Sequence, residues 1–124
     1  MKKWLDEVAV SRKRKIVQLS YTFITDEQLL QINRDFLKHN TYTDIITFDY
    51  SSDLVYKNDI AGEIYISVDR VKENADKFKG TFKDELHRVM AHGLLHLCGL
   101  GDKSAAQSKR MRSAEENALD LRHF

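Results

Sequence analysis

The sequence predicts a single domain of the α+β class, residues 1–124, in which a mixed sheet of about four strands is packed with helices. The first observation is size, because 124 residues fit one domain and are too few for two. The second is composition, since 42% hydrophobic and 31% charged residues are the proportions of an ordinary globular chain. The third is that segments with strand periodicity and segments with helix periodicity both occur along the chain.

Three segments have the pattern of strands. Residues 15–23 alternate, with Val17, Leu19 and Tyr21 on one side, which is the two-residue period of a half-buried strand. Residues 44–50 and 60–67 are rich in Ile, Thr, Phe and Tyr, which favour strands, and a polar stretch separates them. These segments supply most of the predicted sheet.

Four segments have the pattern of helices. Thr25 and Gln28 form a capping box before the first, and Gly99 stands where a left-handed residue ends the third. The predicted ranges are residues 26–38, 67 or 69 to 79, 83–98 and 104–121. The third helix is the most apolar, so we expect it to be the central one.

Charge and cysteine content limit the partners and the compartment. Lys and Arg number 20 against 19 Asp and Glu, so contact with a nucleic acid requires local clustering of basic residues and not a global positive field. The single cysteine, Cys98, excludes an internal disulfide and suits a reducing compartment, which makes the cytoplasm the expected location. No apolar stretch approaches the roughly 18–20 residues that cross a bilayer, and no membrane partner is expected.

Two histidines on the third predicted helix form half of a metal site. His92 and His96 are four residues apart, so their rings project from one face and can share an ion. Gly99 ends the helix, and Asp102 follows at an offset that lets the chain double back and supply an oxygen ligand. Two imidazoles and one carboxylate leave a tetrahedral Zn²⁺ one position for water, whose pKa zinc lowers to about 7. The spacing predicts one catalytic zinc ion per chain.

Four blocks of the sequence resemble the YbeY family of metal-dependent endoribonucleases. Residues 92–99 read HGLLHLCG, which resembles the family motif HGxLHLxGYDH. Residues 32–36, 43–48 and 62–67 resemble the family's LNxxY, PTDVLSF and GDIxIS blocks, in the same order. The resemblance implies a zincin-like domain that cleaves single-stranded RNA during the maturation of ribosomal RNA, notably that of the small subunit. The ribosome or its assembly intermediates would be its partner.

This chain departs from the family motif after the glycine. Leu100, Gly101 and Asp102 stand where the family has Tyr, Asp and His, so the third ligand becomes the carboxylate of Asp102, which zinc accepts. Leu37 stands where the family's LNxxYR block has its arginine. Whether the metal-bound water acts as the nucleophile or as a base is left open.

Basic residues follow the metal motif and are expected to bind substrate phosphates. They are Lys103, Lys109, Arg110 and Arg112. The basic run at residues 12–15 is read as a solvated surface, with RNA contact as the alternative. Asp44 and Glu63 are interpreted either as partners that orient the metal ligands or as structural hydrogen-bonding groups.

Two other functions remain as alternatives to the nuclease. One is a binding module for RNA or the ribosome, in which the altered third ligand has left a degenerate metal site. The other is a zinc peptidase, which is disfavoured because Gly93 occupies the position of the general-base glutamate in an HExxH motif.

Overall fold

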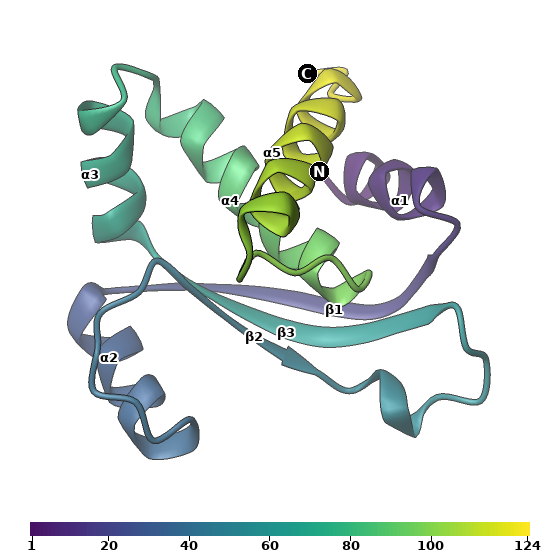
Figure 1. Ribbon diagram of the computed structural model, residues 1–124, viewed down its shortest axis with the longest axis horizontal. Coiled ribbons are helices and arrows are strands. Elements are labelled where there is room, and N and C mark those ends of the chain that lie inside the picture. Colours follow the sequence, from purple (N-terminus) through teal and green to yellow (C-terminus); the bar gives the residue numbers. More distant parts are fainter.

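The computed structural model describes all residues from Met1 to Phe124 and contains five α-helices and three strands (Figure 1). In chain order the elements are α1 (Lys2–Ser11), β1 (Lys15–Ile24), α2 (Asp26–Phe36), β2 (Ile45–Asp49), the 3-10 turn η1 (Ser51–Asp53), β3 (Asp59–Ser67), α3 (Val68–Lys77), α4 (Phe82–Leu97) and α5 (Ala105–Asp120). Each strand and helix expected from sequence periodicity forms, with bounds within two residues of those predicted. The α+β class is therefore confirmed.

The sheet is mixed, as expected, but it has three strands and not about four. Its order is β1-β3-β2, with β1 parallel to β3 and β2 antiparallel to β3. The expectation of a fourth strand is wrong because no segment beyond the three has the period or the composition of a strand. The residues before β1 are helical instead.

Helix α1 was not predicted from the sequence. It buries Trp4, Leu5, Val8 and Ala9, which recur at helical spacing along one face. The indole N–H of Trp4 donates a hydrogen bond to the carbonyl of Ala118 at 2.8 Å, which ties α1 to α5. The N-terminal helix is thus part of the core and not a surface appendage.

Helix α4 lies in the middle of the molecule, as its apolar sequence predicts. It packs against α1, α3, α5 and the strands β2 and β3, and it carries fully buried side chains such as Leu94 and Leu95. A Cβ atom at Gly93 would stand 2.9 Å from the Cδ1 atoms of both Ile45 and Ile64. Glycine therefore allows α4 to approach the sheet closely. Gly99, with φ of +102°, follows the end of the helix in the left-handed region, as expected.

The helices lie on both sides of the sheet. Figure 1 shows α1, α4 and α5 over one face and α2 below the other. The N- and C-termini lie near each other, and Phe124 packs edge-on against Trp4. None of the helices has the length and apolar character needed to span a membrane. The two histidines of the predicted metal site, His92 and His96, are on α4, on the side of the sheet that α4 and α5 cover.

Candidate functional site

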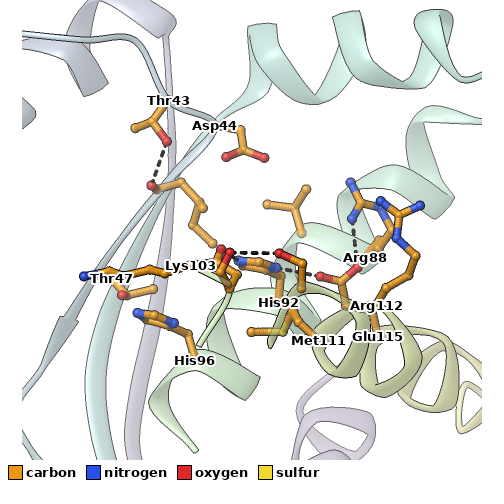
Figure 2. Close-up of a pocket in the computed structure, with 14 residues that line it drawn as sticks. Thr43, Asp44, Thr47, Arg88, His92, His96, Lys103, Met111, Arg112 and Glu115 are labelled. Atoms are coloured by element: carbon orange, nitrogen blue, oxygen red, sulfur yellow. Dashed lines mark hydrogen bonds and ion pairs between the residues drawn. The ribbon is translucent and has the colours of Figure 1, made fainter. Parts of the chain in front are cut away.

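The two histidines open onto a cavity of about 510 Å³. It lies between α4, the first half of α5, the loop that joins them and the start of β2 (Figure 2). Its lining includes Thr43, Asp44, Thr47, Arg88, His92, His96, Asp102, Lys103, Arg112 and Glu115. We refer to it as the histidine cavity.

His92 is held between two carboxylates. Its Nδ1 atom lies 2.6 Å from Oε2 of Glu115, and its Nε2 atom lies 3.4 Å from Oδ2 of Asp102. Glu115 is 3% exposed and lies at the base of the site, whereas Asp102 is on the loop and reaches the ring from the solvent side. The structure thus brings together two of the three predicted metal ligands.

His96 lines the same cavity one helical turn further along α4. Its Nδ1 atom lies 3.0 Å from the carbonyl oxygen of Leu100. A carbonyl only accepts hydrogen bonds, so this contact places the ring proton on Nδ1 and leaves the lone pair on Nε2. That is the tautomer in which an imidazole binds a metal through Nε2.

Glu115 also belongs to a buried ionic network. Arg88 donates from Nη1 to Oε1 of Glu115 at 2.8 Å and binds Glu85 through Nε and Nη2. Both oxygens of Glu115 are therefore engaged, one by Arg88 and one by His92. This arrangement fixes the position of the carboxylate and, through it, the plane of the His92 ring.

The network raises the pKa of His92 and lowers the pKa of Glu115, so both shifts favour the charged forms of the pair. The hydrogen bond to Glu115 raises the pKa of His92 against the opposing effect of burial, and Asp102 and Asp44 add to the rise. Burial works to raise the pKa of Glu115, but hydrogen bonds from His92 and Arg88 outweigh it and the pKa is lowered. Glu115 is consequently a carboxylate that stabilises positive charge on His92.

The predicted ligands fit zinc by their donor chemistry and by one spacing. Two ligand atoms bound about 2.1 Å from a tetrahedral zinc ion are about 3.4 Å apart, and the His92 Nε2 to Asp102 Oδ2 distance is 3.4 Å. No three His, Cys, Asp or Glu side chains converge at metal-binding distance in this structure. His96 therefore shares the cavity with the other two ligands without completing a three-ligand cage.

The four basic residues expected to bind phosphates do not all lie in the histidine cavity. Lys103 and Arg112 line the histidine cavity. Arg110 lines a second cavity on another side of α5, and Lys109 is exposed and lines neither. Only the first two lie beside the predicted ligands.

Asp44 and Glu63 have different surroundings. Asp44 lines the histidine cavity and adds to the rise in the pKa of His92. Glu63 accepts hydrogen bonds from the hydroxyls of Tyr65 at 3.1 Å and Tyr50 at 3.4 Å, away from the histidines. Glu63 is therefore a structural hydrogen-bonding group. Asp44 lies beside the predicted metal ligands.

Glu115 and Arg88 line the site but were not predicted from the sequence. Glu115 lies on the buried stripe of α5 with Met111, Ala114 and Ala118. A charged residue on an apolar helix face is seldom buried without a partner, and that pattern is the signal that indicates a role for Glu115. Its partner on α4 follows only from the packing of the two helices.

The fold and the site define a class of protein, an α+β domain in which a histidine-bearing helix crosses a mixed sheet. The family model described as Endoribonuclease YbeY matches residues 1–122. The chain therefore belongs to the YbeY family of endoribonucleases.

Curated relatives carry the same family name. The Endoribonuclease YbeY of Cytophaga hutchinsonii is 54% identical over 121 residues, covering 98% of this chain and 82% of the relative. That of Flavobacterium psychrophilum is 48% identical over 120 residues, covering 97% and 83%. A solution structure of a Thermotoga maritima protein superposes with a TM-score of 0.68 at 28% identity, covering 97% of this chain and 77% of that one.

Proposed function

We propose that this chain is a zinc-dependent endoribonuclease that cleaves single-stranded ribosomal RNA during its maturation. The proposed partners are rRNA of the small subunit and the ribosome or its assembly intermediates, and the proposed location is the cytoplasm. Besides membership of the family, one observation supports the proposal. His92, His96 and Asp102 line one cavity, and the Nδ1 atoms of both imidazoles are engaged, which leaves both Nε2 atoms for a ligand.

His92, His96 and Asp102 would hold one zinc ion per chain. The hydrogen bonds of the two imidazoles to Glu115 and to the Leu100 carbonyl support this assignment, because partners of this kind orient metal-binding imidazoles. Zinc bound by these ligands supplies a Lewis acid that brings the pKa of water to about 7. A histidine-bearing helix lying across a sheet is consistent with a zincin-like arrangement.

Lys103 and Arg112 would hold the phosphate that reacts. Both line the histidine cavity, and neither forms an ion pair with a carboxylate of the chain. Cleavage of a phosphodiester develops negative charge on the non-bridging oxygens, and cations placed beside those oxygens stabilise it. The role of these two residues is to bind and orient the RNA backbone over the metal ligands.

A peptidase of the HExxH type is disfavoured by the packing of Gly93. A side chain at residue 93 would start 2.9 Å from Ile45 and Ile64, so it would enter the contact between α4 and the sheet. The chain has no carboxylate at residue 93 to act as a base. The cavity is better suited to a reaction that takes its water from the metal and its charge stabilisation from Lys103 and Arg112.

Cleavage of a labelled single-stranded RNA tests the proposal. Wild-type protein loaded with zinc should cleave it, and His96→Ala, purified identically, should lose cleavage while keeping most of its RNA affinity. His123→Ala, which changes an exposed histidine away from the cavity, should cleave like the wild type. Equal cleavage by wild type and His96→Ala would overturn the metal mechanism. Binding without cleavage by any of the proteins would favour the binding module.

A further inference from the structure

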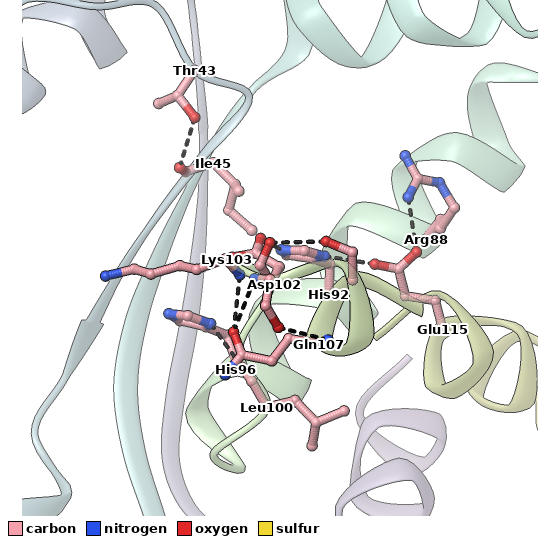
Figure 3. Close-up of polar contacts among 12 residues, drawn as sticks. Thr43, Ile45, Arg88, His92, His96, Leu100, Asp102, Lys103, Gln107 and Glu115 are labelled. Atoms are coloured by element: carbon pink, nitrogen blue, oxygen red, sulfur yellow. Dashed lines mark hydrogen bonds and ion pairs between the residues drawn. The ribbon is translucent and has the colours of Figure 1, made fainter. Parts of the chain in front are cut away.

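A second cavity of about 510 Å³ lies on the other side of the loop that carries Asp102. Its walls are the end of α1 with Arg12, the loop residues Gly99 to Gly101, and one face of α5 with Gln107, Arg110 and Asn117. Figure 3 shows the loop between His96 and Gln107. Gly99, Leu100 and Gly101 of this loop line the second cavity, and Asp102 and Lys103 line the histidine cavity. We call the second cavity the arginine cavity.

The arginine cavity is positively charged. Arg12 and Arg110 line it, and no aspartate or glutamate does. Neither arginine has a carboxylate within 4.0 Å, whereas Arg70, Arg88 and Arg122 each have one. Two guanidinium groups from different elements that face one hollow without a counter-charge make a site for an anion, because a phosphate satisfies them with charge-assisted hydrogen bonds.

The remaining lining groups are neutral and polar. The side-chain carbonyl of Gln107 accepts hydrogen bonds from the backbone N–H groups of Lys103 at 3.1 Å and Ser104 at 3.3 Å. This contact fixes the amide and leaves its NH₂ group as a donor. Ser113 and Asn117 add a hydroxyl and a second amide on the same face of α5. The set is rich in donors, as a phosphate site requires.

The arginine cavity and the histidine cavity are lined by neighbouring residues of the same loop and by different faces of α5. Arg110 and Arg112 are two residues apart, so they project about 200° from each other around the helix axis. One lines the arginine cavity and the other the histidine cavity. Lys103 lies on the loop between them. A chain with regularly spaced negative charges can therefore meet a cation on each side of the loop.

We propose that the arginine cavity binds a backbone phosphate of the single-stranded RNA whose neighbouring segment lies in the histidine cavity. This inference rests on the proposed function and adds a second contact to it. Arg12 and Arg110 hold the distal phosphate, and Gln107 contributes a neutral donor. The contact lengthens the stretch of RNA that the protein engages and does not take part in the reaction.

RNA binding by Arg12→Gln/Arg110→Gln tests the proposal. Both residues are exposed, so the double variant should fold like the wild type. The control is Arg34→Gln/Lys72→Gln, which removes two exposed positive charges on α2 and α3, far from the arginine cavity. All proteins also carry His96→Ala, so that a fluorescein-labelled single-stranded 12-mer stays intact while its Kd is measured by anisotropy from 50 to 200 mM KCl.

The slope of log affinity against log salt should flatten by about 0.7 for each phosphate that Arg12→Gln/Arg110→Gln no longer neutralises. For the single phosphate held by Arg12 and Arg110, the wild-type advantage becomes about 2.6-fold larger at 50 mM than at 200 mM salt. The control should keep the wild-type slope, and Arg12→Lys/Arg110→Lys should restore most of it. An unchanged slope in the Gln variant, or an equal change in the control, would overturn the proposal.

A competition experiment distinguishes binding of the RNA backbone from binding of a free nucleotide. Adenosine monophosphate should compete weakly for the labelled RNA, because it offers one phosphate and cannot span both cavities. Competition as strong as that of unlabelled 12-mer, and dependent on Arg12 and Arg110, would show a nucleotide site and overturn the proposal. These binding results do not depend on cleavage, so failure of the proposed nuclease activity is seen separately in the assay with His96 intact.

Discussion

The carboxylate of Glu115 lies 2.6 Å from Nδ1 of His92, although the two residues are 23 positions apart on different helices. Glu115 is almost fully buried, and its other oxygen accepts a hydrogen bond from Arg88. The contact sets the tautomer and the ring plane of His92, so its Nε2 atom points to Asp102. The orientation of a proposed metal ligand is thus controlled from α5.

Glu115→Gln should weaken zinc binding by about 10- to 100-fold, the usual cost of losing a partner that orients a metal ligand. The amide keeps the shape of the side chain but loses the charge that stabilises the imidazole proton. Competition with a chromogenic chelator measures the zinc affinity. Glu116→Gln, an exposed neighbour on the same helix, is the control. Equal zinc affinity in the two variants would rule out the role given to Glu115.

Asp102→Asn should weaken zinc binding by about tenfold or more, because a neutral amide oxygen is a poorer ligand for a dication than a carboxylate. Asp120→Asn removes the same charge at the exposed end of α5 and should leave the affinity unchanged. The same chelator competition applies. If Asp102→Asn binds zinc as tightly as Asp120→Asn, the third ligand lies elsewhere.

Gly93→Ala should destabilise the fold by about 1 kcal/mol, the midpoint of a net effect of roughly 0–2 kcal/mol. The added methyl would stand 2.9 Å from Ile45 and Ile64, and overpacking of this kind costs about 1–3 kcal/mol, against a gain of about 1 kcal/mol in helix propensity. Denaturant unfolding gives the difference. Gly80→Ala, where nothing lies within 4 Å, should be neutral. A Gly93→Ala protein as stable as wild type would show that α4 can move off the sheet without cost.

His87 should contribute to a loss of stability as the pH drops below about 6.5. Burial lowers its pKa from the ordinary 6.5, and Arg122 and Lys83 act in the same direction. The guanidinium of Arg122 donates to Nδ1 of His87 at 3.0 Å, which requires a neutral ring. Below pH 6.5 the unfolded chain takes up a proton at this residue before the folded chain does, so unfolding is favoured.

Unfolding by urea at pH 7.5 and pH 5.5 checks this dependence. His87→Leu should lose less stability between the two pH values than the wild type does. His123→Gln, which changes an exposed histidine, should behave like the wild type. A loss in His87→Leu as large as that of the wild type would exclude His87 as a source of the acid sensitivity.

Much of the fold could be predicted because local patterns determine it. The alternation in β1 and the capping box at Thr25 are local signals, and this cap forms. Helix α1 was missed because its apolar positions, Trp4, Leu5 and Val8, lie in a short segment with many charges. The expectation of a fourth strand was wrong because only three segments of the chain have a strand pattern, and these three make up the whole sheet.

The site could be predicted only in part. The spacing of His92 and His96 follows from helix geometry alone. The contact of Glu115 with His92 depends on how α5 packs against α4, which no local pattern records. Similarly, Arg110 and Arg112 look equivalent in sequence, but their directions around α5 place them in different cavities.

The zinc content of freshly purified protein tests the central claim most directly. Protein prepared without chelators and analysed for metals should hold close to one zinc ion per chain, and His92→Ala/His96→Ala should hold almost none. Wild-type protein that contains no transition metal, and takes up none on dialysis against zinc, would contradict the assignment of His92, His96 and Asp102 as metal ligands.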